Sequence, residues 1–296
     1  RYLTNAVGQL PWRVMVETTK GADRVPKHPV DYVIGVRPNP EMGSFTFRES
    51  LLGDALLWGN GYAEIERDNA GRLFALHYIH PSRVNAKRDD SYRLVYEVSG
   101  GGGANTILQP SDMYHVRGFG SGPVGFNVVQ YAAQSIGWAE ATTLFGAGFF
   151  GQGMNPSGIV EIPGSLSKEA LTAMDEEWSR LYGGPKGKRT MYLDKGMKFT
   201  PITQQLEQSQ FIESMQHQVE EICRWFGVPP HKVMHLLRST FSNIEHQSIE
   251  VVVDSVTPWV KRFEEEADYK LFGQNRGGFF TKMNLNGLLR GDSQAR

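Results

Sequence analysis

Residues 204–230 read QQLEQSQFIESMQHQVEEICRWFGVPP and carry the clearest helical pattern of the chain. Apolar side chains recur there every three or four residues, which is the spacing of one face of an α-helix. Gly227 is expected to end this helix, and Pro229-Pro230 prevents its continuation because proline lacks the backbone N–H that a helix needs. The stretch therefore predicts a long amphipathic helix with a sharp end. The residues of its apolar stripe are Ile212, Met215, Val219, Ile222 and Phe226.

A second long helix is predicted from Asn243 to about Leu271. Ser242 and Glu245 match the capping box, in which the serine hydroxyl accepts a hydrogen bond from the N–H of Glu245 and the glutamate reaches back to the N–H of Ser242. Pro258 should bend the helix because it removes one helical hydrogen bond. The expected apolar stripe consists of Ile249, Val252, Val253, Val256, Val260 and Phe263.

The N-terminal segments mix strands with helices, which predicts an α+β fold. Residues 1–120 are interpreted as short strands with few helices. Within them, residues 47–58 have helical spacing, and residues 62–79 alternate on both sides of an Asn-Ala-Gly turn, as in a β-hairpin. Residues 91–99 and 112–119 are expected to be two further strands.

The middle and the end of the chain add three further predicted elements. Residues 126–150 read as one helix rich in alanine and glycine, which would let neighbouring helices approach closely. Residues 154–203 predict a small inserted α+β unit, whose helix would be capped by Ser167. A last strand is expected within residues 277–289.

Composition excludes several classes of protein. The chain has 296 residues, a net charge of -1, 40% hydrophobic and 21% charged residues, so a soluble globular protein of about two domains is expected. The near-neutral charge gives no global field that attracts nucleic acid. The one cysteine cannot form an internal disulfide, which fits a reducing cytosol. No apolar run of about 18 residues is present, so no membrane span is expected.

The segment GFGSGPVG, residues 118–125, offers a candidate nucleotide site. It follows a predicted strand, precedes a predicted helix and matches the dinucleotide pattern G-x-G-x-x-G. However, Pro123 removes a backbone N–H where a pyrophosphate needs donors, and Glu140 lies inside a helix instead of after a second strand. A glycine hinge is the favoured interpretation. A nucleotide-binding enzyme that uses this loop is kept as the alternative.

Other chemical motifs are incomplete. His231 and His235 are spaced to hold zinc, but Lys232 stands where a metalloprotease needs its glutamate, and no third ligand is evident. Cys223 lies among the apolar residues of a helix, which indicates a buried thiol. Glutamates 220–221 and 264–266 are interpreted as solvated helix faces. We therefore predict no catalytic residue, no metal and no cofactor, and a protein that is not an enzyme.

Four segments, in a fixed order along the chain, resemble the portal (connector) proteins of tailed bacteriophages. The segments are LLWGNGYAEIERDNAGRLFALHYIHPSRV (56–84), HVRGFGSGPVGFNVVQYAAQSIGWAEATTLFGAGFFGQGMNPSGIV (115–160), QVEEICRWFGVPPHKV (218–233) and STFSNIEHQSIEVVVDSVTPWVKRFEEE (239–266). Each segment alone is a weak signal, but the four together span nearly the whole chain.

The resemblance implies an α+β portal fold with an α/β wing, long stem helices, a small α+β clip and a truncated helical crown. The implied parts are a wing at 1–120, stem helices at 121–153 and 204–227, a clip at 154–203, a tunnel loop at 228–242, a long helix at 243–272 that links tunnel and wing, and the wing end with the start of the crown at 273–296.

The resemblance also implies a function. Such proteins form a homo-oligomeric ring, typically a dodecamer, at one capsid vertex of the virion, after assembly in the host cytoplasm. Double-stranded DNA passes through the ring during packaging and ejection. The implied partners are other copies of the chain, this DNA, the terminase, the head–tail adaptor and the major capsid or scaffold protein, with no membrane.

Two groups of residues are expected to serve this role. The tunnel loop would face DNA, where light, sequence-independent phosphate contacts suit a conduit that must let DNA slide. Its candidate residues are Lys232, Arg238, Ser239, Thr240 and Phe241. The bases before the predicted clip hairpin would dock the terminase, and they are Lys186, Lys188 and Arg189. Residues 243–272 hold seven acids against three bases, and whether those acids face DNA stays open.

Overall fold

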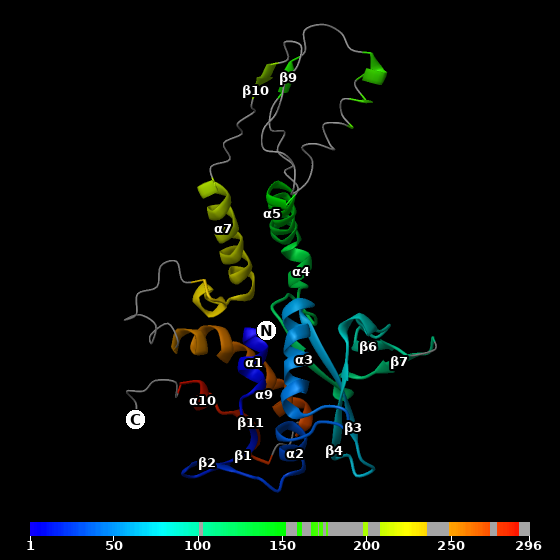
Figure 1. The fold of residues 1–296 in the computed structure, drawn as a ribbon. Coiled ribbons are helices and arrows are strands. Elements are labelled where there is room, and N and C mark those ends of the chain that lie inside the picture. Colours follow the sequence, from blue (N-terminus) through cyan, green and yellow to red (C-terminus); the bar gives the residue numbers. More distant parts are fainter. Residues whose placement is uncertain are drawn as a thin grey trace. The chain divides into compact units, whose positions relative to one another are not determined.

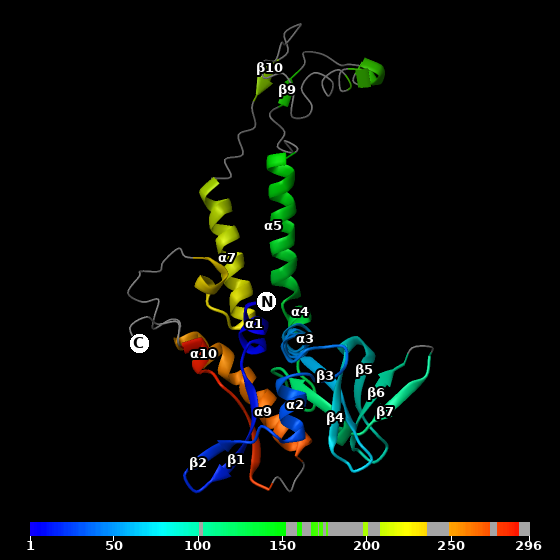
Figure 2. The same ribbon diagram turned by 60° about the horizontal axis from the view of Figure 1, so that its bottom comes forward.

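A computed structural model describes most of the chain (Figures 1 and 2). The described residues are 1–100, 103–151, 159–161, 167–170, 172–173, 176, 198–200, 208–235, 249–272 and 277–289. They fall into two compact units. The first unit comprises Arg1–Ala133 with Glu220–Arg296, and the second comprises Gln134–Val219.

One sheet of the first unit joins the two ends of the chain. Its strand order is β11-β1-β2, with β1 at Trp12–Thr18, β2 at Gly21–Arg24 and β11 at Phe279–Met283. β1 pairs antiparallel with β11, with Trp12 opposite Met283. The predicted last strand is therefore confirmed, and it holds the C-terminal part of the chain against the N-terminal part.

A second sheet has the order β4-β3-β8, with β3 at Asn60–Arg67, β4 at Leu73–Ile79 and β8 at Met113–Arg117. β3 and β4 form the predicted hairpin, in which Tyr62 lies opposite Ile79. Helix α3 (Ser44–Leu57) packs against β3, and helix α9 (Thr257–Leu271) packs against β8 and β11. The predicted helix at 47–58 thus begins three residues earlier than expected.

Shorter elements complete the first unit. A third sheet has the order β5-β6-β7, formed by Val84–Arg88, Leu94–Ser99 and Asn105–Leu108. The single-turn helices η1 (Pro81–Arg83) and η2 (Pro110–Asp112) precede β5 and β8. The pattern in residues 1–120 did not predict α1 (Tyr2–Gly8) and α2 (Pro29–Gly35), and α10 (Asn286–Leu289) follows β11.

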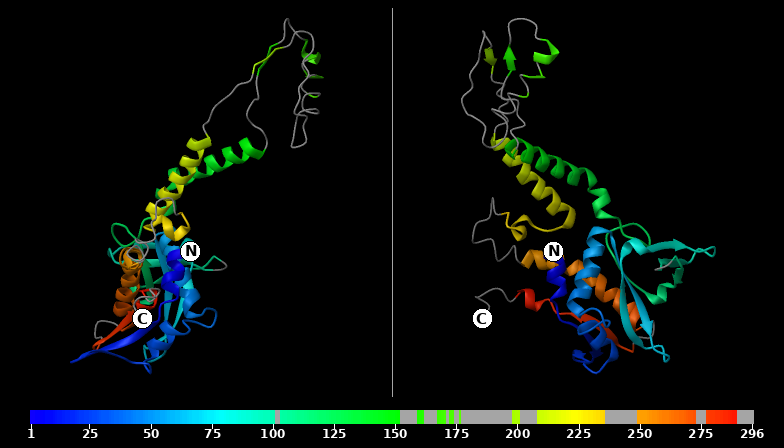
Figure 3. Two further views of the ribbon diagram at one scale, coloured as in Figure 1. Left: turned by 60° about the vertical axis from the view of Figure 1, so that its left-hand side comes forward. Right: turned by 45° about the vertical axis from the view of Figure 1, so that its right-hand side comes forward.

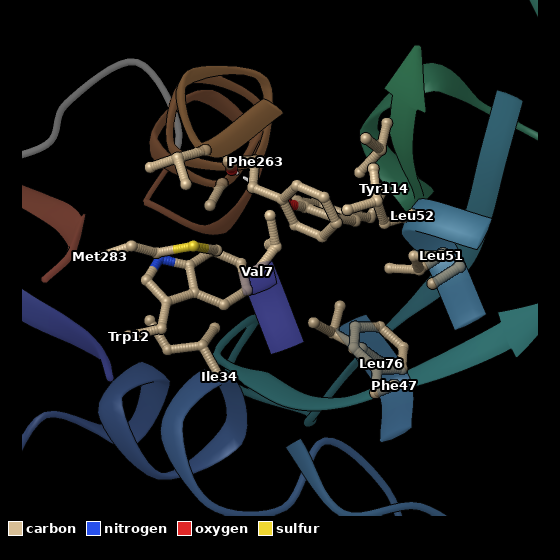
Figure 4. Packing of buried hydrophobic residues seen from close by; sticks show 14 of the residues in the cluster. Val7, Trp12, Ile34, Phe47, Leu51, Leu52, Leu76, Tyr114, Phe263 and Met283 are labelled. Atoms are coloured by element: carbon tan, nitrogen blue, oxygen red, sulfur yellow. Dashed lines mark hydrogen bonds between the residues drawn. The ribbon is translucent and has the colours of Figure 1, made fainter. Parts of the chain in front are cut away.

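The main core lies between these sheets and helices (Figure 4). Trp12 is almost fully buried and meets Phe263 of α9 edge to face, with ring centroids 6.0 Å apart. The Tyr114 hydroxyl donates to the carbonyl oxygen of Phe263 at 2.8 Å, so the buried phenol has its polar partner. Val7, Phe47, Leu51, Leu76 and Met283 close the same cluster.

The start of the second long helix corrects the predicted stripe. Residues Val251–Val256 form the π-helical turn η5, just before Pro258. The Thr257 N–H bonds the carbonyl of Val252, five residues back, so the wider turn spaces residues differently from an α-helix. As a result Val251 is buried, whereas Ile249 and Val253 are exposed. Both exposed residues were predicted for the stripe, and both predictions are wrong.

The acidic run on α9 is only in part the solvated face that its composition indicated, because Glu265 is exposed, whereas Glu264 is buried and Glu266 is partly buried. Glu264 is buried and accepts the Met283 N–H at 2.8 Å, and Lys282 lies 3.2 Å from it. Glu266 accepts the His115 N–H at 3.1 Å. These carboxylates fix α9 to β8 and β11, because a buried carboxylate needs hydrogen-bond or charged partners.

The second unit contains most of α5 (Ala133–Gly151), α7 (Gln208–Phe226) as far as Val219, and a short antiparallel pair of strands. The strands are β9 (Ile159–Glu161) and β10 (Lys198–Thr200), with Phe199 opposite Val160. The predicted helix at 126–150 is not continuous, because α4 (Val128–Tyr131) ends at Ala132 before α5 begins. Its first helical residue is Val128, whose N-terminal cap is the Asn127 side chain.

Candidate functional site

Helices α5 and α7 pack against each other within the second unit, through a polar and aromatic face of α7. Trp138 and His217 have ring centroids 5.9 Å apart, and the Gln218 side-chain amide donates to the Thr142 hydroxyl at 2.7 Å. Phe145 and Phe211 make a further ring contact. Gly146 allows this approach, because a Cβ there would lie 2.7 Å from the Phe211 ring.

Most of the apolar stripe of α7 lies beside the face that meets α5 in this pair. Ile212 and Val219 are displaced around the helix from Phe211 and Gln218, whereas Met215 lies four residues after Phe211 and three before Gln218 and so borders the face that meets α5. The second-unit members of the stripe are Ile212, Met215 and Val219, which are 54%, 37% and 38% exposed. On α5, Leu144 is exposed as well, next to small exposed residues such as Gly137, Ala141 and Ala147. Burying such apolar area contributes about 25 cal/mol per Å², so both helices offer surface for a further partner.

The turn after α7 belongs to the first unit and has a fixed backbone. Gly227 takes a left-handed φ of 60°, as predicted for a helix end, and the Val228 N–H bonds the Cys223 carbonyl at 3.0 Å. The single-turn helix η3 (Pro230–Val233) follows and ends at Met234, which has φ 64°. The Ser255 hydroxyl donates to the Gly227 carbonyl at 2.6 Å, which ties this turn to η5.

Lys232 is the one predicted tunnel-loop residue within the described part, and it lies partly exposed in η3. Arg238, Ser239, Thr240 and Phe241 lie outside the described residues, as do the predicted capping pair Ser242 and Glu245. The predicted docking bases Lys186, Lys188 and Arg189 lie outside them too. The predicted cap of the inserted unit is present, because the Ser167 hydroxyl accepts the Ala170 N–H at 3.3 Å.

The two histidines of this turn form no metal-binding group among the described residues. His231 lies in η3 and His235 follows its left-handed cap residue Met234, so they do not share the helix face that a zinc site would use. Burial, with Lys232 beside it, lowers the pKa of His231. The His235 Nε2 atom is 3.9 Å from a Glu220 carboxylate oxygen.

The glycine loop at 118–125 is packed against its own chain. The Gly118 N–H bonds the Gly59 carbonyl at 2.8 Å, and the Gly125 N–H bonds the Asn60 side-chain oxygen at 2.7 Å. A Cβ at Gly125 would lie 2.1 Å from the Gly59 oxygen. These glycines therefore serve close backbone packing, and the N–H groups of Gly118 and Gly125 that a pyrophosphate would need already have partners.

A buried polar network supports this loop. His115 of β8 has its Nε2 atom 2.9 Å from the Asn60 oxygen and its Nδ1 atom 3.1 Å from the Tyr96 hydroxyl. Burial, together with the neighbouring cations Lys270 and Arg117, lowers the pKa of His115 to about 3. The imidazole is therefore neutral and acts as a hydrogen-bonding link between loop and sheet.

Two structural features of the first unit have only a weak signal in the sequence. Phe119, within the glycine loop, is 79% exposed, whereas the sequence indicated a glycine hinge there and no exposed aromatic ring. An apolar groove lies between α1, the end of α3 and the end of α7. Cys223 lines it and is 7% exposed, so the predicted burial of this thiol is confirmed. Within the described residues, no helix has the length and apolar character that crossing a membrane requires.

Comparison with known sequences identifies one family. A family model described as "Phage portal protein" matches residues 1–296. The chain is 31% identical over 278 residues to a probable portal protein of Streptomyces phage phiC31, covering 88% of this chain and 60% of that protein. It is 28% identical to the portal protein of Enterobacteria phage HK97, covering 91% of this chain and 64% of that protein. The chain thus spans less than two thirds of the length of these curated relatives.

Solved structures show the same fold. The neck of an empty GTA particle, computed with C6 symmetry, contains a chain that matches with a TM-score of 0.71 and 22% identity, covering 96% of this chain and 79% of that one. The crystal structure of an HK97-family phage portal protein from Corynebacterium diphtheriae matches with a TM-score of 0.69 and 15% identity, covering 98% and 92%.

Proposed function

Because the chain belongs to the phage portal protein family and has its mixed α+β fold, we propose that it is the subunit of a ring at one capsid vertex. Double-stranded DNA enters and leaves the capsid through this ring. The observation that carries the proposal is the exposed apolar stripe of α7 at Ile212, Met215 and Val219. A ring closes head to tail only if each copy offers two different complementary surfaces.

The exposed faces of α5 and α7 supply two such surfaces. α5 offers small residues and Leu144, and α7 offers the larger side chains of its stripe. Small residues on one helix and large ones on the other allow the helix axes to approach and the side chains to interdigitate. The α5 face of one copy would then pack against the α7 stripe of the next.

The parts of the chain take roles accordingly. In this proposal residues 1–120 form a wing, 121–153 and 204–227 the stem, 154–203 the clip and 228–242 the tunnel loop. The helix at 243–272 links tunnel and wing, and residues 273–296 hold the wing end and the start of the crown. The ring requires no catalysis by this chain, and packaging energy would come from the terminase, since no P-loop pattern occurs in the sequence.

Electron microscopy of the purified chain tests the ring directly. We expect closed rings in negative stain and one discrete assembly mass by mass photometry. Met215→Asp should abolish the rings without unfolding the subunit, because it places a charge on the exposed stripe of α7. Glu213→Gln, on the same helix but outside the stripe, is the matched control and should leave the rings intact. Monomers at every concentration in the wild type would contradict the proposal.

DNA passage is tested at the tunnel loop. Arg238→Glu should leave ring assembly intact and lower the amount of DNA packaged in vitro, because a carboxylate repels passing phosphates. Lys232→Gln should have the same effect to a smaller degree, since it removes a charge without reversing it. Arg238→Lys keeps the charge and is the control. Normal packaging by Arg238→Glu rings would contradict the role of this loop.

Terminase docking is tested at the proposed clip. Lys186→Glu, Lys188→Glu and Arg189→Glu together should weaken binding of the terminase to preformed rings, because they replace three bases with acids. Arg83→Glu, on η1 of the first unit, is a single-charge control with no expected effect on docking. Unchanged terminase binding by the triple variant would remove this site while leaving the ring proposal intact.

A further inference from the structure

Arg48 of α3 is a buried cation in the first unit. It is 5% exposed, and its side chain reaches the end of α1, where Nη2 donates to the Gly8 carbonyl at 2.6 Å. The Nε and Nη1 atoms are buried as well, and neither has a hydrogen-bond partner among the described residues. A buried polar group without a partner costs free energy, and a buried charge costs more.

Arginine does not avoid this cost by losing its proton. Burial, together with the nearby cation Arg13, lowers the pKa of Arg48 to about 10, so the guanidinium stays charged at neutral pH. A lysine at the same depth could become neutral, because the pKa of an ammonium group shifts readily on burial. The positive charge of Arg48 therefore has to be balanced by a group close to its free nitrogen atoms.

The carboxylates of α9 do not balance this charge. Among the described residues Arg48 forms no ion pair, and its one hydrogen bond is the bond to Gly8. The acidic run of α9 lies on the other side of the unit from α1 and α3 (Figure 3, left panel). Its carboxylates are already engaged, since Glu264 and Glu266 accept backbone N–H groups of β11 and β8. These acids are therefore not partners of Arg48.

The end of α1 balances only part of the charge. Gly8 is the last residue of this helix, and the carbonyl groups at a helix C-terminus carry about half a negative charge. A second guanidinium adds positive charge nearby, because Arg13 donates from Nη1 to the Trp12 carbonyl at 3.3 Å. The same atom of Arg13 lies against the end of α2, where a Cβ at Gly35 would be 2.1 Å away. The interior beside Arg48 thus has an excess of positive charge.

We propose that the free N–H groups of Arg48 bind a small inorganic anion, a halide such as chloride, inside the first unit. A residue that is 5% exposed is out of reach of an acidic side chain from another molecule, whereas a monatomic anion is small enough to enter. A water molecule would accept the same hydrogen bonds but would leave the charge unbalanced, so the charge favours the anion. The inference does not depend on the proposed ring.

Thermal melting in two sodium salts tests the site, because a ligand that binds only the folded chain stabilises it by mass action. At equal ionic strength, the wild type should melt at least about 3 °C higher in chloride than in gluconate, an organic anion too large for a buried site. Arg48→Met removes the charge and keeps an unbranched side chain, so it should melt at the same temperature in both salts. Arg37→Gln, at an exposed arginine that follows α2, is the matched control and should keep the wild-type difference.

Bromide gives an independent measurement that needs no substitution. Crystals of the wild-type chain grown or soaked in sodium bromide should show an anomalous scattering peak within hydrogen-bonding distance of the Arg48 guanidinium. The peak should disappear when the same crystals are returned to gluconate. This measurement keeps the proposal testable even if Arg48→Met does not fold.

Three results would overturn the site. Equal melting temperatures of the wild type in chloride and gluconate would show that no halide stabilises the fold. A difference that persists in Arg48→Met would place the halide elsewhere. Electron density that shows only water on the Arg48 guanidinium, with no bromide peak, would mean that water satisfies the free donors and that the charge stays unbalanced.

Discussion

The first unit and the α5–α7 pair differ in how completely each buries its own apolar residues. In the first unit Trp12, Phe47, Phe263 and Met283 are almost fully buried within one chain. On α5 and α7, apolar side chains of similar size remain exposed, including Ile212 and Leu144. Both regions carry clear apolar patterns, but among the described residues the first unit buries its apolar side chains more completely. The exposure on α5 and α7 is what the proposed contact between copies would cover.

The strongest test of this contrast is a cavity in the first unit. Phe263→Ala should lower the free energy of unfolding by about 3–5 kcal/mol, because it removes a buried ring that contacts Trp12 and Tyr114. Urea denaturation followed by tryptophan fluorescence measures the loss. Tyr269→Ala, at an exposed position of the same helix, is the control and should change stability by less than about 0.5 kcal/mol. A similar loss of unfolding free energy in Phe263→Ala and Tyr269→Ala would contradict the difference in burial between these two positions.

Two glycine substitutions compare the backbone packing of the first unit with that of α5. Gly125→Ala should cost about 3 kcal/mol, because its Cβ would lie 2.1 Å from the Gly59 carbonyl oxygen. Gly137→Ala on α5 meets no atom within 4 Å and should raise helix stability by up to about 1 kcal/mol. Thermal melting of both variants checks the opposite signs. A neutral Gly125→Ala would mean that the glycine loop at 118–125 can shift away from Gly59.

The pH dependence of the first unit should come in part from His115. Its folded pKa is about 3, whereas an unfolded histidine titrates near pH 6.5. The unfolded chain therefore binds more protons between these values, so this contribution is full above pH 6.5 and is lost as the pH falls towards 3. We expect a loss of about 2 kcal/mol between pH 7 and pH 5. Urea titrations at several pH values measure this loss of unfolding free energy, which His115→Gln should lack. The same dependence of unfolding free energy on pH in His115→Gln and in the wild type would contradict the prediction.

Substitutions in the exposed stripe of α7 are expected to change the stability of the subunit least. Met215→Ser or Val219→Ser should change the unfolding free energy of the isolated subunit by less than about 0.5 kcal/mol, because both side chains already contact solvent. The same changes should shift assembly to higher protein concentration, as measured by mass photometry. A large loss of subunit stability would show that the stripe is covered within one chain.

Local patterns predicted many elements of the fold, and particular residues show where they were insufficient. The stripe in 204–230, the hairpin at 62–79 and the glycine end at Gly227 follow from local spacing and were confirmed. Val253 also lies at helical spacing within its predicted stripe, yet it is 56% exposed. The π-helical turn before Pro258 rotates the residues that precede it relative to those of α9. The sequence predicts a solvated Glu264, yet this residue is buried against β11, a strand that begins 15 residues later in the chain.

In the candidate site, the sequence indicated the glycine loop and the turn after α7. It did not indicate which residues these two segments contact. Phe119 lies where a predicted strand meets the predicted glycine hinge, and the loop that carries it is bonded to Gly59 and Asn60 at the start of β3. Lys232 was predicted, and it lies in η3. The groove beside Cys223 has no signature in one segment, because three helices from different parts of the chain form it.

The family resemblance, the amphipathic helices, the hairpin and the near-neutral charge can all be read from the amino-acid sequence alone, since each depends on neighbouring residues or on composition. The contacts between distant segments show which apolar faces are buried, which carboxylates hold α9, and which aromatic ring of the glycine loop is exposed. The physical reason is that burial is a property of pairs of surfaces. A helical stripe records that a face is apolar, whereas the partner that covers it is set by contacts between distant segments, or by another copy of the chain.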